Sequence, residues 1–312
     1  MTGMAKEPDR IVLGRTPTPI EPVSGLLPGV TIAVKRDDLT GLELTGNKVR
    51  KLEYLLAEAL SQGKRRLLTC GGIQSNHCRA TAVAAAKLGL ASLVFLRVTE
   101  PPPPESEWTG NLRLMRLVGA EVRFITPEQY RRRHQVMADA SEASDYLIPE
   151  GGSNALGAWG YIRAIDELMS QWDEPPSSIL CATGSGGTLA GLVLGARRRG
   201  LDVPIHGVCV CDDAAYFRAV VARIGEEAHA RWPELPAVAA RDVLVVEGYV
   251  GRGYALSTPE EEAELASVAR ATGLLLDPVY TGKAFRALLH EPDRFGPRPL
   301  FLHTGGIFGL MA

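Results

Sequence analysis

The sequence has no long uninterrupted apolar run and no surplus of charge of either sign. A helix that spans a bilayer needs about 20 consecutive apolar residues, and no stretch of these 312 residues supplies them. The formal net charge is -2, so electrostatics give no reason to expect a nucleic acid or a membrane as partner. The start, MTGMAKEPDR, lacks the apolar core of a secretory signal. We therefore expect a cytoplasmic protein.

Cysteine is scarce and shows no paired framework. The five cysteines are Cys70, Cys78, Cys181, Cys209 and Cys211. An odd number argues against a secreted, disulfide-stabilised domain. Cys209 and Cys211 form a C-x-C pair, but no second Cys or His pair completes the four ligands that zinc usually takes. We expect buried free cysteines and no metal site.

Short apolar runs alternate with longer amphipathic segments along the chain. This alternation is typical of an α/β protein with a mostly parallel sheet, and the length suffices for two modest domains. The expected strands are residues 31–35, 66–70, 92–97, 121–125, 146–149, 178–182, 205–211, 243–247 and 300–303. The expected helices follow Asn47, Asn76, Thr109, Pro127, Asn154, Gly186, Asp213, Thr258 and Thr281, several of which are helix-capping residue types.

Few segments interrupt this pattern. The prolines at 101–104 exclude helix and central strand, and they predict a rigid loop. The arginines at 131–133 are expected on a solvated helix face. No repeat is visible and no linker composition marks a domain boundary. We therefore expect one domain to be inserted into the other rather than to follow it.

The segment KRDDLTGLELTGNKVRKLEYLLAEAL places a lysine at the start of a helix. Asn47 can cap this helix, and leucines 52, 55, 56 and 60 would line its inner face. Lys48 would feel the positive end of the helix dipole, and Arg50 and Lys51 add like charge. These effects, with any burial, disfavour the ammonium form and make the amine more nucleophilic. The alternative is a solvated basic first turn.

The segment LLTCGGIQSNHCRATAVAAAKLG carries a tight glycine turn before an alanine-rich helix. Ser75 or Asn76 can cap that helix, and capping alone would explain both residues. A Ser–His nucleophilic pair is not expected, because no G-x-S-x-G elbow is present. His77 on its own is expected to be structural.

The segment ILCATGSGGTLAGL runs from a strand through Thr183–Thr188 into a helix. Successive N–H groups and hydroxyls at a helix N-terminus form a cradle that suits a phosphate. No Gly-Lys-Ser/Thr follows, so the segment is not a P-loop. Leu189 stands where a dinucleotide motif needs its last glycine. A lone phosphate fits best, and a glycine turn that only allows close packing is the alternative.

Three further segments, EGYVGRGYALST, LLLDPVYTGKAF and FLHTGGIFG, place Tyr254, Tyr280, Thr281 and Thr304 at glycine-flanked ends of elements. A buried tyrosine with a satisfied hydroxyl is the usual case, and a proton donor is the functional alternative. Together, the four regions supply an activated amine, a phosphate cradle and several hydroxyls. These are the groups that a pyridoxal-phosphate site needs.

The motifs KRDDLTGLELTGNKVRKLE, GGIQSNH, ATGSGGTLAGL, LDPVYTGKA and HTGG occur in this order between residues 35 and 309. In them the chain resembles the fold-type II pyridoxal-phosphate enzymes that comprise D-cysteine desulfhydrase and 1-aminocyclopropane-1-carboxylate deaminase. The resemblance implies an α/β fold like that of the tryptophan synthase β subunit, with two three-layer α/β/α domains and mostly parallel sheets. Residues 1–47 and 162–312 would form the large domain, and residues 48–161 the small inserted domain. The cofactor would lie in the cleft between them, in a homodimer.

The resemblance also implies a role for each residue singled out above. Lys48, beside Asn47, would hold pyridoxal 5'-phosphate as a Schiff base. Tyr254 and Tyr280 correspond to the family's active-site tyrosines. The cofactor phosphate would contact Gly184, Ser185, Gly186, Gly187 and Thr188, and its ring would contact Asn76 and Thr304. The small amino-acid substrate would contact Ser75, Asn76, His77, Thr281 and Gly305, the first three beside its carboxylate.

Two threonines favour one branch of the family. The deaminase branch typically has a glutamate straight after the second tyrosine, near the pyridine nitrogen, where this chain has Thr281. Thr304 resembles the neutral partner of that nitrogen in the desulfhydrase branch. An unprotonated ring is a weaker electron sink, which favours prompt loss of a β-substituent. We therefore expect a β-eliminating lyase that converts D-cysteine, as first candidate, to sulfide, pyruvate and ammonia.

In this reaction the amine of Lys48 or the hydroxyl of Ser75 would remove the α-proton, and Tyr280 would protonate the leaving group. Three departures from the family pattern leave the substrate open: Thr45 replaces a glycine, Phe308 replaces a proline, and Arg252 could reach an anionic substituent. The alternatives are a relative that acts on 1-aminocyclopropane-1-carboxylate, cysteate or another β-substituted alanine, and a non-catalytic amino-acid-binding protein. A nicotinamide oxidoreductase is disfavoured by the missing G-x-G-x-x-G.

Overall fold

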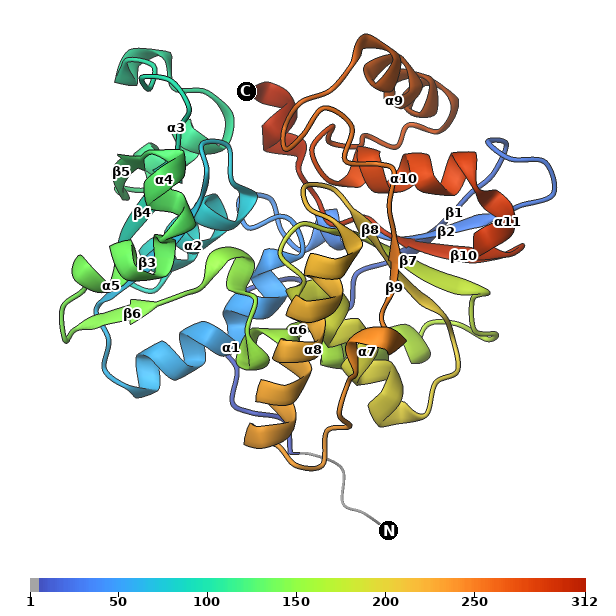
Figure 1. Ribbon diagram of the computed structural model, residues 1–312, viewed down its shortest axis with the longest axis horizontal. Helices are drawn as coiled ribbons and strands as arrows, with labels where there is room; N and C mark the ends of the chain where they lie inside the picture. The colour runs from blue at the N-terminus through green and yellow to red at the C-terminus, as the bar shows by residue number, and fades with distance from the viewer. Residues whose placement is uncertain (1–5) are drawn as a thin grey trace.

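The computed structural model describes residues 6–312, so the first five residues of the MTGMAKEPDR segment lie outside the described range. Strands and helices alternate along the chain (Figure 1). The strands are β1 (Ile20–Val23), β2 (Ile32–Lys35), β3 (Arg66–Gly72), β4 (Ala91–Arg97), β5 (Glu121–Ile125), β6 (Asp145–Leu147), β7 (Ser178–Thr183), β8 (Ile205–Cys209), β9 (Leu244–Val246) and β10 (Pro299–Leu302). The α-helices are α1 (Lys48–Ser61), α2 (Asn76–Lys87), α3 (Gly110–Leu117), α4 (Pro127–Arg131), α5 (Arg133–Asp139), α6 (Ala155–Met169), α7 (Gly187–Arg199), α8 (Ala214–Arg231), α9 (Pro259–Thr272), α10 (Thr281–His290) and α11 (Pro292–Phe295).

The larger sheet has the strand order β1-β2-β10-β7-β8-β9. Its neighbouring strands pair in parallel, except that β1 pairs with β2 in the antiparallel direction. The sequence did not predict β1. This strand, IEPV, is short and partly exposed, and it contains Pro22, which is tolerated because β1 lies at the sheet edge.

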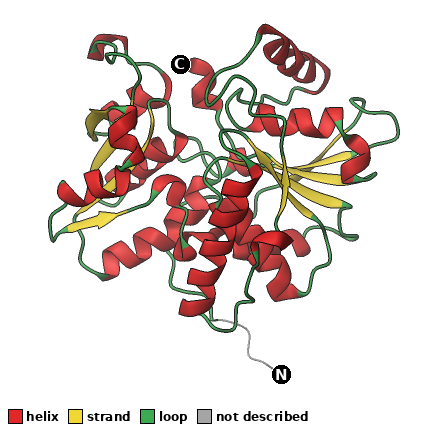
Figure 2. Ribbon diagram, viewed as in Figure 1, coloured by secondary structure: helices red, strands yellow, loops and turns green. Residues whose placement is uncertain are grey.

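The smaller sheet has the order β5-β4-β3-β6, and all of its pairs are parallel. Alternate residues of β4 face two different apolar clusters. Leu93 and Phe95 join a cluster with residues of α4 and α5, whereas Val94 and Leu96 join one with residues of α2 and α3. Helices therefore cover both faces of this sheet (Figure 2), as buried parallel strands require. The predicted α/β fold with mostly parallel sheets is confirmed.

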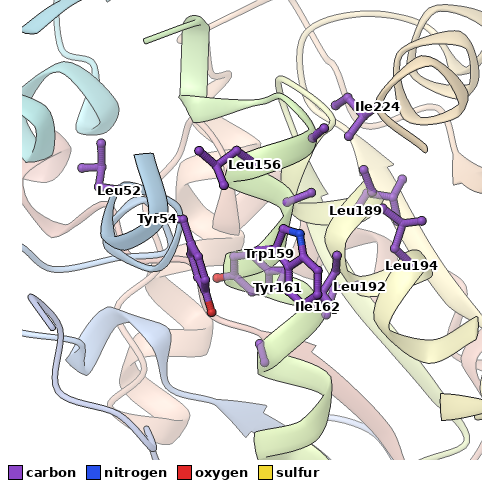
Figure 3. Packing of buried hydrophobic residues seen from close by; sticks show 14 of the residues in the cluster. Leu52, Tyr54, Leu156, Trp159, Tyr161, Ile162, Leu189, Leu192, Leu194 and Ile224 are labelled. Atoms are coloured by element: carbon purple, nitrogen blue, oxygen red, sulfur yellow. The ribbon is translucent and has the colours of Figure 1, made fainter. Parts of the chain in front are cut away.

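A large apolar cluster lies between the two sheets and holds them together. It contains residues of α1, α6, α7 and α8, with Trp159 and Tyr161 of α6 among its largest buried side chains. Figure 3 shows Trp159 and Ile162 of α6 close to Leu192 of α7. Gly191 of α7 allows this approach, because a Cβ there would lie 2.4 Å from the Ala158 carbonyl oxygen.

The predicted inserted domain can be compared with this arrangement. The smaller sheet is built from residues 66–147, all within the segment 48–161. The predicted boundary at residues 161 and 162, however, falls inside the continuous helix α6, which packs against both α1 and α7. The exact domain limits therefore stay a prediction.

Most predicted helix starts agree with the structure to within one residue, and three details of capping and burial differ. Ser75, not Asn76, caps α2, since its Oγ accepts a hydrogen bond from the Cys78 N–H at 3.2 Å. Asn47 precedes α1, but its side chain makes no capping bond. Leu60, expected on the inner face of α1, is 38% exposed. Residues 101–104 form a loop, as predicted. No helix within residues 6–312 combines the length and apolarity needed to cross a membrane.

Candidate active site

A cavity of about 400 Å³ lies where the carboxyl ends of β3, β4 and β7 meet the starts of α1, α2 and α7. It brings together segments far apart in the sequence. The predicted site residues that line it are Asn47, Lys48, Ser75, Asn76, His77, Gly184, Ser185, Gly186, Thr188, Tyr254, Tyr280, Thr304 and Gly305.

Two predicted site residues, Thr281 and Gly187, do not line this cavity. Thr281 is fully buried, and its hydroxyl donates to Asp277 Oδ1 at 2.5 Å. Asp277 also accepts from the Tyr280 N–H at 2.9 Å, so Thr281 helps to fix the start of α10. The N–H of Gly187 donates to Ser153 Oγ at 3.2 Å and is therefore already used within the protein.

Lys48 is the first residue of α1, and its amine opens into the cavity. Burial lowers the pKa of Lys48 to about 8, against the opposing influence of Glu150 and Asp277. The Nζ donates to Asn47 Oδ1 at 3.2 Å, and Asn47 Nδ2 donates to Thr188 Oγ1 at 3.0 Å. The side chain of Asn47 therefore connects the amine with the glycine loop instead of capping α1. The amine is partly deprotonated near neutral pH, as a nucleophile requires.

Arg50 does not supply the like charge that the sequence suggested. Its guanidinium group turns away from the cavity and forms two hydrogen bonds to Asp37, at 2.7 and 2.8 Å. It also donates to Glu167 of α6 at 2.8 Å, and Tyr161 donates to Asp37 at 2.5 Å. These buried, charge-assisted bonds fasten the first turn of α1 to α6, and they fix the backbone that carries Lys48.

The loop before Lys48 lies against the end of the HTGG motif. The N–H of Asn47 donates to the Thr304 carbonyl at 3.1 Å. Gly46 has a φ of 101°, and a Cβ there would lie 2.8 Å from the same carbonyl oxygen, so only glycine fits. Thr45 has no positive φ, and its hydroxyl donates to the Asp38 carbonyl. The threonine that replaces the family's glycine is therefore accommodated without backbone strain.

The loop Thr183–Thr188 runs from β7 into α7, whose N–H groups and dipole favour an anion. Ser185 Oγ lies 2.9 Å from Ser153 Oγ. Lys51 lies on the same side: it is 1% exposed, and its Nζ donates to the Gly151 carbonyl at 3.1 Å. Among residues 6–312 no carboxylate forms an ion pair with Lys51, and burial holds its pKa well below the usual value. A phosphate bound at this loop would favour the charged form of the buried Lys51 amine, which has no carboxylate partner in the described residues.

The two predicted tyrosines lie together at the cavity. Their hydroxyl oxygens are 2.6 Å apart and their ring centroids 5.9 Å apart. Burial raises the pKa of Tyr254 to about 12 and that of Tyr280 well above its usual value. Both hydroxyls therefore keep their protons near neutral pH. Glycine makes room for each ring, because a Cβ at Gly72 or Gly184 would lie 3.0 or 3.1 Å from a ring carbon.

The start of α2 contributes the third part of the lining. Asn76 Oδ1 accepts from Asn111 Nδ2 at 3.0 Å, which orients the amide. His77 Nε2 lies 2.8 Å from the Thr69 hydroxyl, which in turn donates to the Ile148 carbonyl at 2.9 Å. Burial, with the nearby lysines, holds the pKa of His77 well below its usual value. His77 is therefore neutral and fixed to β3.

The outer part of the cavity contains residues that the sequence did not indicate. They are Arg97, Tyr130, Arg131, Arg133, Glu150, Asp212 and Tyr216. Glu150 could have been suspected, because PEGGSN at 149–154 again places glycines between a strand and a helix. The arginines gave no such signal, and 131–133 were expected to be solvated. Arg133 instead lies over the Tyr130 ring at 5.1 Å from its centroid.

Most of the remaining candidates lie away from the cavity. Arg252 is exposed and Phe308 stacks under the Arg79 guanidinium group at 5.2 Å; neither lines the cavity. Cys209 is buried and Cys211 lies at the cavity edge. Within the described residues no group of three His, Cys, Asp or Glu side chains is placed to hold a metal ion.

A family model, sequence relatives and a solved structure all indicate the same family. The family model described as "Pyridoxal-phosphate dependent enzyme" matches residues 11–305. A putative 1-aminocyclopropane-1-carboxylate deaminase of Thermotoga maritima is 44% identical over 97% of this chain and 98% of its own length. The bifunctional D-cysteine desulfhydrase/1-aminocyclopropane-1-carboxylate deaminase of Arabidopsis thaliana is 42% identical, over 96% of this chain and 78% of its own length.

A D-cysteine desulfhydrase of Salmonella paratyphi A is 38% identical over 97% of this chain and 95% of its own length. The solved structure of an ACC deaminase homologue superposes with a TM-score of 0.87 and 34% identity, and it covers 98% of this chain and 94% of that chain. The predicted fold type is thereby confirmed. The chain belongs to the pyridoxal-phosphate dependent enzymes of fold-type II.

Proposed function

We propose that this enzyme is a β-eliminating lyase that converts a small β-substituted amino acid, with D-cysteine as first candidate, to a 2-oxo acid, ammonia and the leaving group. One observation carries the proposal: the amine of Lys48, with a lowered pKa, opens into a cavity that also contains the protonated pair Tyr254 and Tyr280. A base and an acid in one cavity are what removal of an α-proton and loss of a β-substituent require. The relatives named D-cysteine desulfhydrase support the choice of substrate.

The residues present fit pyridoxal phosphate. Lys48 would hold it covalently, and Ser185, Gly186 and Thr188 would hold its phosphate at the start of α7. The phosphate would favour protonation of the buried Lys51 amine, which bonds the Gly151 carbonyl. Asn76 would contact the ring hydroxyl. When bound, the cofactor withdraws electrons from the α-carbon of an attached amino acid, which no protein side chain does.

Thr304 supports elimination over ring opening. It is the proposed partner of the ring nitrogen and is neutral, and Thr281 is engaged with Asp277. Of the carboxylates that line the cavity, Glu150 receives the Tyr130 hydroxyl bond and lies 3.1 Å from Arg133 Nε. Glu150 is therefore engaged with Tyr130 and Arg133, and we do not assign it to the ring nitrogen.

The substrate carboxylate would bind at the start of α2, where Ser75, Asn76 and the helix N–H groups lie. The Lys48 amine, once free, can accept the α-proton near neutral pH because its pKa is about 8. The hydroxyl of Ser75 is the alternative acceptor. The Tyr280 hydroxyl can give its proton to the departing group, and Tyr254, 2.6 Å away, can resupply it.

Cytoplasmic location and a homodimer are also part of the proposal. The unpaired pattern of five cysteines supports a reducing compartment. Light scattering of the purified enzyme tests the dimer, and a mass of one chain would contradict it.

The function is tested by incubating the cofactor-loaded enzyme with D-cysteine, L-cysteine and 1-aminocyclopropane-1-carboxylate, with 2-oxo acid and sulfide measured in parallel. Equal release of both products from one cysteine enantiomer is expected. A 2-oxo acid from the cyclopropane substrate, with none from either cysteine, would show a deaminase instead. That outcome would fit the relative from Thermotoga maritima by name.

A further inference from the structure

We propose that Arg97 is a specificity residue that binds an anionic group on the side chain of the substrate. The inference rests on the proposed function and narrows its substrate class. It predicts that amino acids with a carboxylate or sulfonate on the side chain bind more tightly than neutral ones of the same shape.

Arg97 is the last residue of β4 and lies in the cavity lining. Its register partner on β3 is Gly72, the glycine that makes room for the Tyr254 ring. The guanidinium carbon lies 5.2 Å from the Tyr254 ring centroid and 4.9 Å from that of Tyr130. Arg97 therefore packs against the same tyrosine whose hydroxyl bonds Tyr280.

The charge of Arg97 has no counterpart in the described part of the chain. No carboxylate there forms an ion pair with it, and no hydrogen bond from its guanidinium group is present. The other two arginines of the lining differ in this respect. Arg131 pairs with Glu128 at 3.0 Å, and Arg133 lies 3.1 Å from Glu150. Of these three arginines, only Arg97 has no carboxylate partner among the described residues.

The guanidinium group lies over the two tyrosine rings, and no acceptor in the described residues takes its N–H groups. Stacking of this kind is favourable for arginine and fixes the orientation of its planar fork. Such a fork matches a carboxylate or a sulfonate with two parallel hydrogen bonds. Because the α-carboxylate of the substrate has its own place at the start of α2, Arg97 is assigned to a second anionic group.

The test compares ligands that differ in charge but hardly in shape. Aspartate and asparagine, each in both enantiomers, and cysteate are titrated into the cofactor-loaded enzyme, with binding followed by calorimetry and by the cofactor absorbance. We expect aspartate and cysteate to bind the native enzyme roughly tenfold or more tightly than asparagine, as for a hydrogen bond between charged groups. Arg97→Gln should abolish this preference and leave asparagine binding unchanged.

Arg123→Gln is the matched control. Arg123, on the neighbouring strand β5, also lies over an aromatic ring, that of Phe95 on β4. It is outside the cavity and pairs with Glu121. This variant should keep the full preference for aspartate. Arg97→Lys keeps the charge and loses the planar fork, so its preference should lie between those of the native enzyme and Arg97→Gln.

Three outcomes would overturn the inference. Equal binding of aspartate and asparagine to the native enzyme would show that no anionic group is recognised. If Arg97→Gln weakens the binding of aspartate and of asparagine by the same factor, Arg97 binds the α-carboxylate instead. If cysteine is turned over in either case, the proposed function stands and the role of Arg97 alone is wrong. If no amino acid binds or reacts, both proposals fail.

Discussion

The hydroxyl oxygens of Tyr254 and Tyr280 lie 2.6 Å apart, one on the loop before α9 and the other at the start of α10. Burial keeps both hydroxyls protonated. Tyr280 can therefore donate a proton to the substrate and then receive one from Tyr254. Gly72 and Gly184, at the carboxyl ends of strands in different sheets, leave the space in which the two rings meet. The proton donor of the proposed reaction is thus assembled by both sheets.

Tyr280→Phe tests the donor directly. Loss of the hydroxyl should lower kcat by roughly 100-fold, the usual effect of removing a general acid, with little change in cofactor content. The loss should shrink for substrates whose leaving group needs no proton. Tyr249→Phe is the control, since its hydroxyl bonds Glu291 outside the cavity. An equal loss of kcat for all leaving groups would contradict the assignment.

The lowered pKa of Lys48 predicts how the apoprotein captures its cofactor. Only the neutral amine reacts, so the rate of covalent capture should rise with pH up to about 8 and then level off. With an ordinary lysine, whose pKa is 10.5, the rate of capture would continue to rise well above pH 8. Stopped-flow absorbance measures the rate, and Nα-acetyl-lysine, measured in parallel, gives the pH profile of an unshifted amine. A rate that rises without a plateau to pH 10 would show that burial does not shift this amine.

The same shift predicts a contribution to stability. Between about pH 8 and 10.5 the unfolded chain holds a proton on Lys48 that the folded apoprotein has lost. The contribution of Lys48 to the free energy of unfolding should therefore increase as pH rises through this window. Denaturant unfolding of the native apoprotein and of Lys48→Met isolates it, because the variant lacks this pH dependence. Parallel curves for the two proteins would contradict the prediction.

Gly46→Ala tests the contact between the Lys48 loop and Thr304. A positive φ disfavours alanine, and the added Cβ would meet the Thr304 carbonyl oxygen at 2.8 Å, so we expect a loss of about 2–3 kcal/mol in the free energy of unfolding. Cofactor affinity should fall too, because Asn47 and Lys48 follow directly.

Gly63→Ala provides the comparison for Gly46→Ala. Gly63 has a φ of 67° but nothing within 4 Å of an added Cβ. Gly63→Ala should lower the free energy of unfolding by only about 1–2 kcal/mol and leave cofactor affinity unchanged. Equal effects of the two substitutions would show that the contact with Thr304 has no special role.

Lys51→Met tests the phosphate cradle. Replacing the buried amine with an apolar side chain should leave the apoprotein as stable as before or more stable. The preference for pyridoxal phosphate over pyridoxal should fall by roughly tenfold. Lys283→Met is the control, because Lys283 is also buried and bonds the Val250 and Gly253 carbonyls away from the cradle. A preference that survives in Lys51→Met would place the phosphate elsewhere.

The inner site could be predicted from the sequence because its signals are local. Glycines and hydroxyl or amide side chains follow strands within a few residues in GGIQSNH and ATGSGGT, and the chain order of strands and helices follows from apolar periodicity. The sequence could not separate Arg50 from Lys51. These neighbours have opposite environments: Arg50 forms an ion pair with Asp37, whereas the Lys51 amine donates to the Gly151 carbonyl and has no carboxylate partner in the described residues.

The outer site could not be predicted, because it depends on tertiary packing alone. Arg97 and Tyr130 are far from Tyr254 in the sequence, and no motif connects either residue with that tyrosine. The edge strand β1 was missed for a related reason. Its short IEPV sequence is strand-like only when β2 pairs with it.

The most direct test of the central claim compares the cofactor-loaded native enzyme with Lys48→Ala on D-cysteine and L-cysteine. The account predicts equal amounts of 2-oxo acid and sulfide from one enantiomer with the native enzyme. It predicts no turnover by Lys48→Ala, and no covalent cofactor in that variant after borohydride reduction. Turnover by Lys48→Ala at close to the native rate, or a cofactor still attached covalently, would contradict the assignment of Lys48.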